Sequence, residues 1–263
     1  MSAAATSGAY LGSLFSLAGR RALVTGGNSG LGEGIARALG RAGASVWIVA
    51  RRNEELAATV AAFRAEGITA ESLAVDLTDR DALRDAARRV QQASGGVDIL
   101  VNAAGINLRQ PFMDVRDEDW DLTLGINLKV PFLLVQQFAP GMRERGFGRI
   151  VNVTSLQTAR AFPNSAPYGA SKGGLAQLTR AIAEAWSPYG ITCNAIAPGF
   201  FKTALTAPVF ADPTRAAAMA AQTMIGRNGA PDDLAGTAVF LAGTASAYVT
   251  GQMLFVDGGF SAR

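Results

Sequence analysis

The regular alternation of short apolar runs with longer helical patterns restricts the fold of this chain more than any other feature of its sequence. Strands that are separated by helices pair in parallel, and strands that are apolar throughout belong to a sheet covered on both faces. The sequence therefore predicts the α/β class. We expect a single doubly wound, Rossmann-type domain over residues 1–263, with a central parallel sheet of about seven strands and helices on both faces.

The pattern also gives approximate positions for the elements. Strands are expected at residues 22–25, 45–50, 73–75, within 97–103, and at 149–153, 191–196 and 253–256. Helices are expected at residues 31–42, 54–66, 79–93, 117–145, 167–186 and 231–241. Residues 1–16 precede the first strand and are interpreted as an N-terminal extension.

The composition excludes several classes of function. The chain has no His and one Cys, so a histidine base, an intrachain disulfide and a thiolate metal cluster are excluded, and no metal site is predicted. The one cysteine, Cys193, lies in an apolar run and is predicted to be a buried structural thiol. Lys and Arg (24) exceed Asp and Glu (21) by only three, without a long basic run, which argues against a nucleic-acid partner.

Signals for a membrane or for secretion are not expected in this sequence. It has no stretch of about 20 apolar residues free of Pro and Gly, so no membrane partner is predicted. The first 19 residues lack the Lys and Arg of a signal or transit peptide. We therefore expect a cytoplasmic location.

The first predicted strand runs into the turn Thr-Gly-Gly-Asn-Ser-Gly-Leu-Gly at residues 25–32. Glycines between a strand and a helix let the backbone turn tightly and approach a pyrophosphate, while the helix N-terminus offers free N–H groups and a partial positive charge. The turn also opens the first βα unit, where dinucleotides bind in such folds. It predicts a dinucleotide site made by Gly26, Asn28, Ser29, Gly30, Leu31 and Gly32.

Because the chain has no His, proton transfer near neutral pH must use other side chains. Tyr168 and Lys172 are four residues apart in a predicted helix, so they share one helix face. A nearby ammonium group lowers the pKa of a phenol, which would let Tyr168 act as the acid in reduction and as the base in oxidation. Ser155, at the end of a predicted strand, could hydrogen-bond the substrate oxygen.

The spacing Gly-x-x-x-Gly-x-Gly after a Thr, in place of Gly-x-Gly-x-x-Gly, resembles the short-chain dehydrogenase/reductase family, and the resemblance covers nearly the whole chain. Further motifs of that family follow in order, namely Asp76, Asn102-Ala103-Ala104-Gly105, Asn127, Ser155, Tyr168-x-x-x-Lys172, and Pro198-Gly199 with Thr203. The resemblance implies an NAD(P)-dependent enzyme that interconverts a secondary alcohol and a ketone by hydride transfer.

The same resemblance implies roles for individual residues. Asn127, Ser155, Tyr168 and Lys172 would be catalytic, with Asn127 maintaining a water-linked proton path and Lys172 also holding the nicotinamide ribose. Further cofactor contacts would come from Asp76, Leu77, Asn102, Ala103, Ala104, Gly105, Tyr168, Pro198, Gly199, Phe201 and Thr203. The family would also place a substrate lid over residues 203–225. It implies a homotetramer, with the helices at 117–145 and 167–186 in one interface and the C-terminal strand in another.

The end of the second predicted strand bears on the choice of cofactor. An acidic residue there would accept the adenosine ribose hydroxyls and disfavour a 2′-phosphate, but the strand is followed by Arg51 and Arg52. Arg51 is placed to pair with a phosphate. Asn28 and Ser29 argue in the opposite direction, because many NADP-using relatives carry a basic residue in this turn. We predict a preference for NADP(H), with NAD(H) as the alternative.

Three residues are candidates for substrate contacts. Arg109 follows the Asn-Ala-Ala-Gly strand end, and Gln157 and Arg160 follow Ser155. Residues 105–111 and 230–234 resemble family members that act on sugar acids, so Arg109 is hypothesised to pair with a substrate carboxylate. The Ala- and Met-rich lid leaves a 3-oxoacyl thioester reductase or a broad-specificity ketone reductase as an alternative. A non-catalytic dinucleotide-binding regulator is the alternative of another class.

Overall fold

The computed structural model describes residues 3–263, with the backbone alone for residues 3–7. Its centre is a seven-stranded sheet in the order β3-β2-β1-β4-β5-β6-β7, in which all neighbouring strands are parallel. The strands are β1 (Arg21–Thr25), β2 (Ser45–Ala50), β3 (Ala70–Ala74), β4 (Ile99–Asn102), β5 (Gly148–Val153), β6 (Ile191–Pro198) and β7 (Met253–Val256). The predicted α/β fold with a parallel sheet is confirmed.

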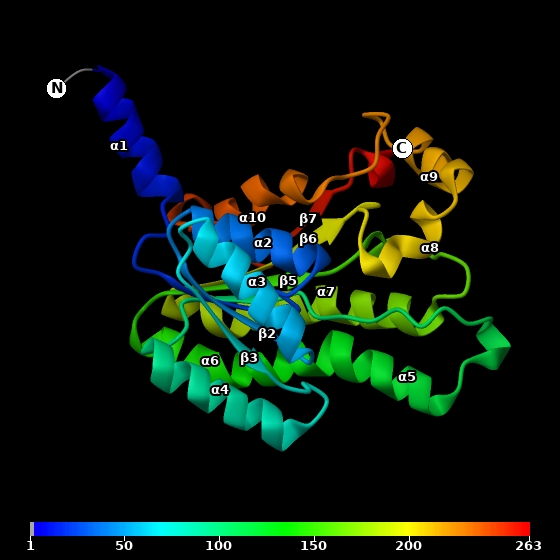
Figure 1. Ribbon diagram of the computed structural model, residues 1–263, viewed down its shortest axis with the longest axis horizontal. Helices are drawn as coiled ribbons and strands as arrows, with labels where there is room; N and C mark the ends of the chain where they lie inside the picture. Colours follow the sequence, from blue (N-terminus) through cyan, green and yellow to red (C-terminus); the bar gives the residue numbers. More distant parts are fainter. Residues whose placement is uncertain (1–2) are drawn as a thin grey trace.

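Helices cover both faces of the sheet, as predicted (Figure 1). One face carries α2 (Gly30–Arg41), α3 (Asn53–Ala65) and α10 (Ala235–Ala242), and the other carries α4 (Arg80–Ser94), α6 (Val130–Glu144) and α7 (Ala166–Trp186). Because successive side chains of a strand point to opposite faces, Val24 of β1 enters one apolar core and Leu23 enters the other. This double burial explains why the strands are apolar without a polar alternation.

The third strand differs from its predicted position. It was expected at residues 73–75 and forms at Ala70–Ala74 instead. Pairing with β2 determines these bounds, since Val46 is opposite Ala70 and Ala50 is opposite Ala74. The strand lies at the edge of the sheet, so its backbone pairing needs no continuous apolar run, and the exposed Glu71 is tolerated.

The helix expected at residues 117–145 consists of α5 (Asp117–Leu124), a π-helical turn at Gly125–Lys129, and α6. By length and composition the joined segment Asp117–Glu144 could cross a membrane, and it is the one such helix among the described residues. Its side chains Leu134, Phe138 and Met142 are buried in the core beneath the sheet. The segment is therefore a core helix of this domain.

The predicted N-terminal extension is largely helical. Helix α1 (Ala3–Phe15) projects from the body of the domain (Figure 1), while residues 1 and 2 lie outside the described part of the chain. The end of α1 is attached to the domain by the Thr244 hydroxyl, which donates to the carbonyl of Ser13 at 2.8 Å. The extension thus contacts the domain near the amino ends of the strands, on the side opposite their carboxyl ends.

A buried carboxylate links three segments at the amino end of β4. Asp98 is 2 % exposed and accepts hydrogen bonds from Arg21 Nε and Nη2, both at 2.8 Å, and from Arg145 Nε at 3.1 Å. Burial alone would raise the pKa of Asp98, but the hydrogen bonds from Arg21 and the charges of both arginines outweigh it and hold the pKa below its ordinary value. The charged cluster fixes the start of β1 against β4.

We expect Asp98→Asn to destabilise the fold by about 3 kcal/mol, because it leaves two guanidinium groups at a buried site without their carboxylate. The measurement is the free energy of unfolding in urea. The matched control is Asp85→Asn, which removes an exposed pair with Arg88 and should cost less than about 1 kcal/mol. Equal losses in the two variants would contradict the role assigned to Asp98.

Candidate active site

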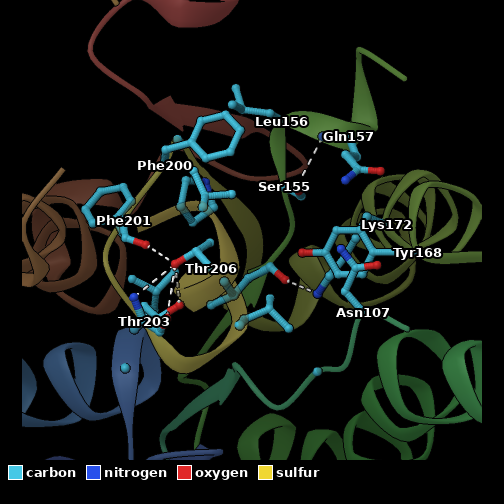
Figure 2. A pocket seen from close by; sticks show the side chains of 18 of the residues that line it. Asn107, Ser155, Leu156, Gln157, Tyr168, Lys172, Phe200, Phe201, Thr203 and Thr206 are labelled. Carbon is cyan, nitrogen blue, oxygen red and sulfur yellow. Dashed lines mark hydrogen bonds between the residues drawn. The ribbon is translucent and has the colours of Figure 1, made fainter. Parts of the chain in front are cut away.

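The candidate site is a cavity of about 780 Å³ at the carboxyl ends of the strands. It lies where the strand order reverses, because the chain leaves β1 toward β2 and β4 toward β5. Open parallel sheets bind their ligands at such a crevice. The walls come from the turn after β1, the ends of β4 and β5, the start of α7, and the segment after β6 (Figure 2).

The glycine-rich turn is shaped for a close approach of a ligand to the backbone. Gly26 and Gly30 have φ of +67° and +57°, a region that favours glycine. A Cβ on Gly32 would lie 2.2 Å from the carbonyl oxygen of Gly26, so no other residue fits there. The backbone thus forms a cradle at the N-terminus of α2, as a dinucleotide pyrophosphate requires.

Thr25 holds the two sides of the crevice together. Its hydroxyl accepts hydrogen bonds from the N–H groups of Ala103 (3.1 Å) and Ala104 (3.2 Å), at the end of β4. The same hydroxyl donates a hydrogen bond to the Val101 carbonyl at 3.4 Å. This role of Thr25 was not predicted, although a polar side chain at the end of an apolar strand is a signal for it.

A second cavity of about 200 Å³ continues from the turn along the ends of β2 and β3. In it Asp76 accepts hydrogen bonds from the N–H (2.9 Å) and hydroxyl (2.8 Å) of Thr78, which lower its pKa, with a smaller effect from the charge of Arg51. Arg52 is paired with Glu55 at 2.7 Å, whereas Arg51 is exposed and has no ion pair in the described part of the chain. The guanidinium of Arg51 is therefore available to a ligand.

Helix α7 and the end of β5 bring the predicted catalytic side chains together (Figure 2). Tyr168 and Lys172 are 7 % and 4 % exposed, and the Lys172 Nζ lies 5.6 Å from the centre of the Tyr168 ring. The Nζ donates to the carbonyl of Val153 at 2.7 Å, which ties α7 to β5. Ser155 follows this strand, and its hydroxyl accepts from the N–H of Gln157 at 3.2 Å.

Burial dominates the protonation of the buried pair. It raises the pKa of the Tyr168 phenol, while the interaction with Ser155 and the charge of Arg109 oppose that rise. Burial without a carboxylate partner lowers the pKa of Lys172 to about 8, so its amine is still mostly charged near neutral pH. The lowering of the phenol's pKa by Lys172 and a bound nicotinamide stays a prediction.

Asn127 belongs to the frame of the site. Its Nδ2 donates to the carbonyl of Ile106 (2.9 Å) and to the hydroxyl of Ser171 (3.0 Å), and its Oδ1 accepts from the Ile106 N–H (2.9 Å). The π-helical turn presents this side chain toward the end of β4, as such turns often do near functional sites. Asn127 thereby holds the loop after β4 against α7, and it does not line the cavity.

The other predicted residues divide clearly by position. The two cavities are lined by Gly26, Asn28, Ser29, Gly30, Leu31, Gly32, Arg51, Asp76, Leu77, Ala103, Ala104, Gly105, Arg109, Ser155, Gln157, Tyr168, Lys172, Pro198, Gly199, Phe201 and Thr203. Asn102 lines neither, because its amide donates to Asn152 at 2.8 Å inside the sheet. Arg160 lies outside both and lines a neighbouring cavity of about 490 Å³, which shares Gln157 and Phe162 with the larger one. Its guanidinium lies 5.0 Å above the Phe260 ring and donates to the Phe260 carbonyl at 3.4 Å.

The predicted lid contains α8 (Ala207–Phe210) and α9 (Pro213–Ala221). It begins at Thr203, whose side chain would lie 3.3 Å from a Cβ on Gly30, so this segment rests on the glycine-rich turn. Several lining residues of the larger cavity were not predicted individually, notably Asn107, Phe162, Phe200, Arg215 and Met219. The first three lie in loops and the last two in the lid, and their place after strand ends was the only sequence signal for a role in the cavity.

Several known proteins with similar sequences are oxidoreductases of sugar acids by name. Residues 26–261 match the family described as enoyl-(acyl carrier protein) reductase. The chain is 41 % identical over 248 residues to gluconate 5-dehydrogenase of Gluconobacter oxydans (strain 621H), covering 94 % of this chain and 97 % of the relative. It is 41 % identical over 254 residues to 2-dehydro-3-deoxy-D-gluconate 5-dehydrogenase of Bacillus subtilis (strain 168), covering 97 % and 99 %.

A solved structure supports the same relationship. The crystal structure of a gluconate 5-dehydrogenase from Burkholderia cenocepacia J2315, in complex with NADP and tartrate, matches with a TM-score of 0.92 and 39 % identity. The match covers 96 % of this chain and 99 % of that one. Similarity therefore extends over the sheet, the crevice and the lid.

We expect the stability of the protein to depend on pH through Lys172. Its pKa is about 8 when folded and ordinarily 10.5, so between these values the unfolded chain binds one more proton than the folded chain. The contribution of Lys172 to the free energy of unfolding should therefore rise with pH across that window by about 3 kcal/mol in total, so the difference between the wild type and Lys172→Met should change by this amount. Urea unfolding at a series of pH values measures it. Lys129→Met, at an exposed site, is the control and should behave like the wild type.

Proposed function

Because the chain belongs to the short-chain dehydrogenase/reductase family, and is an NAD(P)-dependent oxidoreductase of CH–OH groups, we propose that it interconverts a secondary alcohol and a ketone on a sugar acid. One observation carries the choice of substrate class. The charged side chains that line the larger cavity are all basic, namely Arg109, Lys172 and Arg215, and no Asp or Glu among residues 8–263 lines it. A cavity with this lining favours an anionic substrate.

In this proposal Tyr168 is the proton-transfer residue. When a ketone is reduced, the phenol donates its proton to the carbonyl oxygen, and when an alcohol is oxidised the phenolate takes the proton from the hydroxyl. Ser155 donates a hydrogen bond to the same oxygen and stabilises the developing charge. The bound nicotinamide cofactor supplies or accepts the hydride. The raised pKa of Tyr168 keeps the phenol protonated near neutral pH, which is the form that the reduction step uses.

We expect Tyr168→Phe to lower kcat about 10²- to 10⁴-fold, the usual contribution of general acid–base catalysis, while cofactor binding is retained. Turnover is followed by the absorbance of the reduced nicotinamide, and binding by its fluorescence. Tyr248→Phe removes a hydroxyl from a fully exposed ring and should leave kcat unchanged. A Tyr168→Phe variant with near-normal turnover would refute the assignment.

For the cofactor we propose a preference for NADP(H). The observation in its favour is Arg51, which borders the smaller cavity as an unpaired guanidinium next to Arg52 and Asp76. A guanidinium binds a phosphate in a bidentate manner, and the strand end offers no carboxylate among the lining residues other than Asp76, which Thr78 holds. The NADP-bound relative described above is consistent with this choice.

We expect Arg51→Gln to reduce kcat/KM for NADPH about 10- to 100-fold, the cost of one charge-assisted hydrogen bond, and to leave kcat/KM for NADH nearly unchanged. Steady-state kinetics with both cofactors measures the ratio. Arg52→Gln is the matched control, because Arg52 is already held by Glu55. A wild-type enzyme that prefers NADH would overturn the proposal before any variant is tested.

We also propose that the protein works as a homotetramer. Large apolar side chains remain exposed on two surfaces, with Trp120, Leu122 and Phe132 along α5 and α6, and Phe255 on the edge strand β7. Exposed apolar surfaces of this kind are typical of contacts between subunits. Equilibrium sedimentation should give four times the mass of the 27.2 kDa chain, and a monomer at micromolar concentration would exclude this assembly.

A further inference from the structure

Helix α9 places a basic side chain over the cavity. Arg215 and Met219 are four residues apart, so they lie on one face of α9, and both line the larger cavity. The elements below them belong to the fixed frame of the sheet, whereas α9 belongs to the segment of residues 203–225. The face of α9 that is turned to the cavity thus carries one positive charge.

The Arg215 guanidinium has only one long ion pair among the described residues. Its closest carboxylate is Asp212, with 3.9 Å between Arg215 Nε and Asp212 Oδ2, and the Arg215 side chain is 70 % exposed. The Asp212 carboxylate already caps α9 by accepting from the N–H groups of Thr214 (2.9 Å) and Arg215 (3.2 Å). By contrast, the next arginine along the chain, Arg227, is held by Asp233 through two bonds of 2.6 and 2.8 Å.

A second guanidinium, that of Arg109, borders the cavity from the side of the sheet. Arg109, in the loop after β4, lines the same cavity and has no ion pair within the described residues. Its positive charge also opposes the rise in the pKa of Tyr168, which lines the same cavity. Two cations from different elements therefore border one cavity that no carboxylate lines. The pyrophosphate of a dinucleotide has its own cradle in the turn of residues 26–32, which leaves both arginines for another anion.

We propose that Arg215 is a substrate-specificity residue, which binds the substrate carboxylate together with Arg109. This inference rests on the proposed function. A carboxylate accepts bidentate bonds from one guanidinium and a further bond from another. The anion then bridges the frame and α9, so that an anionic substrate draws α9 toward the cavity and an uncharged analogue does not. Arg215 makes no contact with the reacting oxygen in this arrangement, and its effect is on binding.

The test compares two probes that differ in the carboxylate alone, D-gluconate and D-glucitol. In Arg215→Met the KM for D-gluconate should rise about 10- to 100-fold with kcat within about threefold of the wild type, and the kinetics with D-glucitol should not change. Arg215→Lys should recover part of the loss, because it restores the charge without the bidentate geometry. The double variant with Arg109→Met should lose less than the product of the two single effects, since both side chains bind one group.

Arg84→Met is the matched control, because Arg84 likewise follows an aspartate by three residues in the first turn of a helix, with a 3.5 Å pair to Asp81. It should leave all constants unchanged. If the wild type shows no preference for D-gluconate over D-glucitol, the proposed function fails. If that preference exists and Arg215→Met retains it, this inference alone is wrong. A rise in the KM for NADP⁺ instead would assign Arg215 to the cofactor phosphates and would also overturn it.

Discussion

The divergence of the chain at the ends of β1 and β4 is the constraint on which the candidate site depends. These neighbouring strands pair in parallel, but their connections run to opposite sides, so a crevice opens between them. The Thr25 hydroxyl holds the two strand ends together below the crevice through the N–H groups of Ala103 and Ala104. The proposed cofactor and substrate contacts reach the crevice from strand ends, from the loops that follow them, and from helices α7 and α9.

Burial determines the protonation of the proposed catalytic pair. Tyr168 and Lys172 lie in a region without a carboxylate partner for the amine, so both pKa values shift toward the uncharged forms. The chain has no His to take over proton transfer. The positive charge of the cavity therefore comes mainly from arginines, which stay charged in any environment of this kind. In the proposed mechanism, proton transfer by Tyr168 is thus separate from attraction of the anionic substrate by the arginines.

The sequence predicted most of the frame and part of the site. Strands buried on both faces and the glycine-rich turn follow from local patterns, because a buried strand must be apolar and the Gly32 position admits no Cβ. The bounds of β3 could not be predicted in this way, since backbone pairing determines them at the sheet edge. The position of Arg160 outside the larger cavity and that of Arg215 within its lining were likewise beyond local patterns. Both positions depend on how loops distant in sequence fold over the strand ends.

The packing of β5 against β6 has a consequence for the chemistry of sulfur. Cys193 is buried as expected, with no exposed surface, beside the amide of Asn152 at 3.7 Å, and burial raises the pKa of its thiol. A thiol without access and without thiolate character does not react with oxidants, alkylating agents or other disulfides. Since the chain has no other cysteine, we expect the folded protein to be inert to thiol–disulfide exchange. Its activity should then be independent of the thiol redox state of its surroundings.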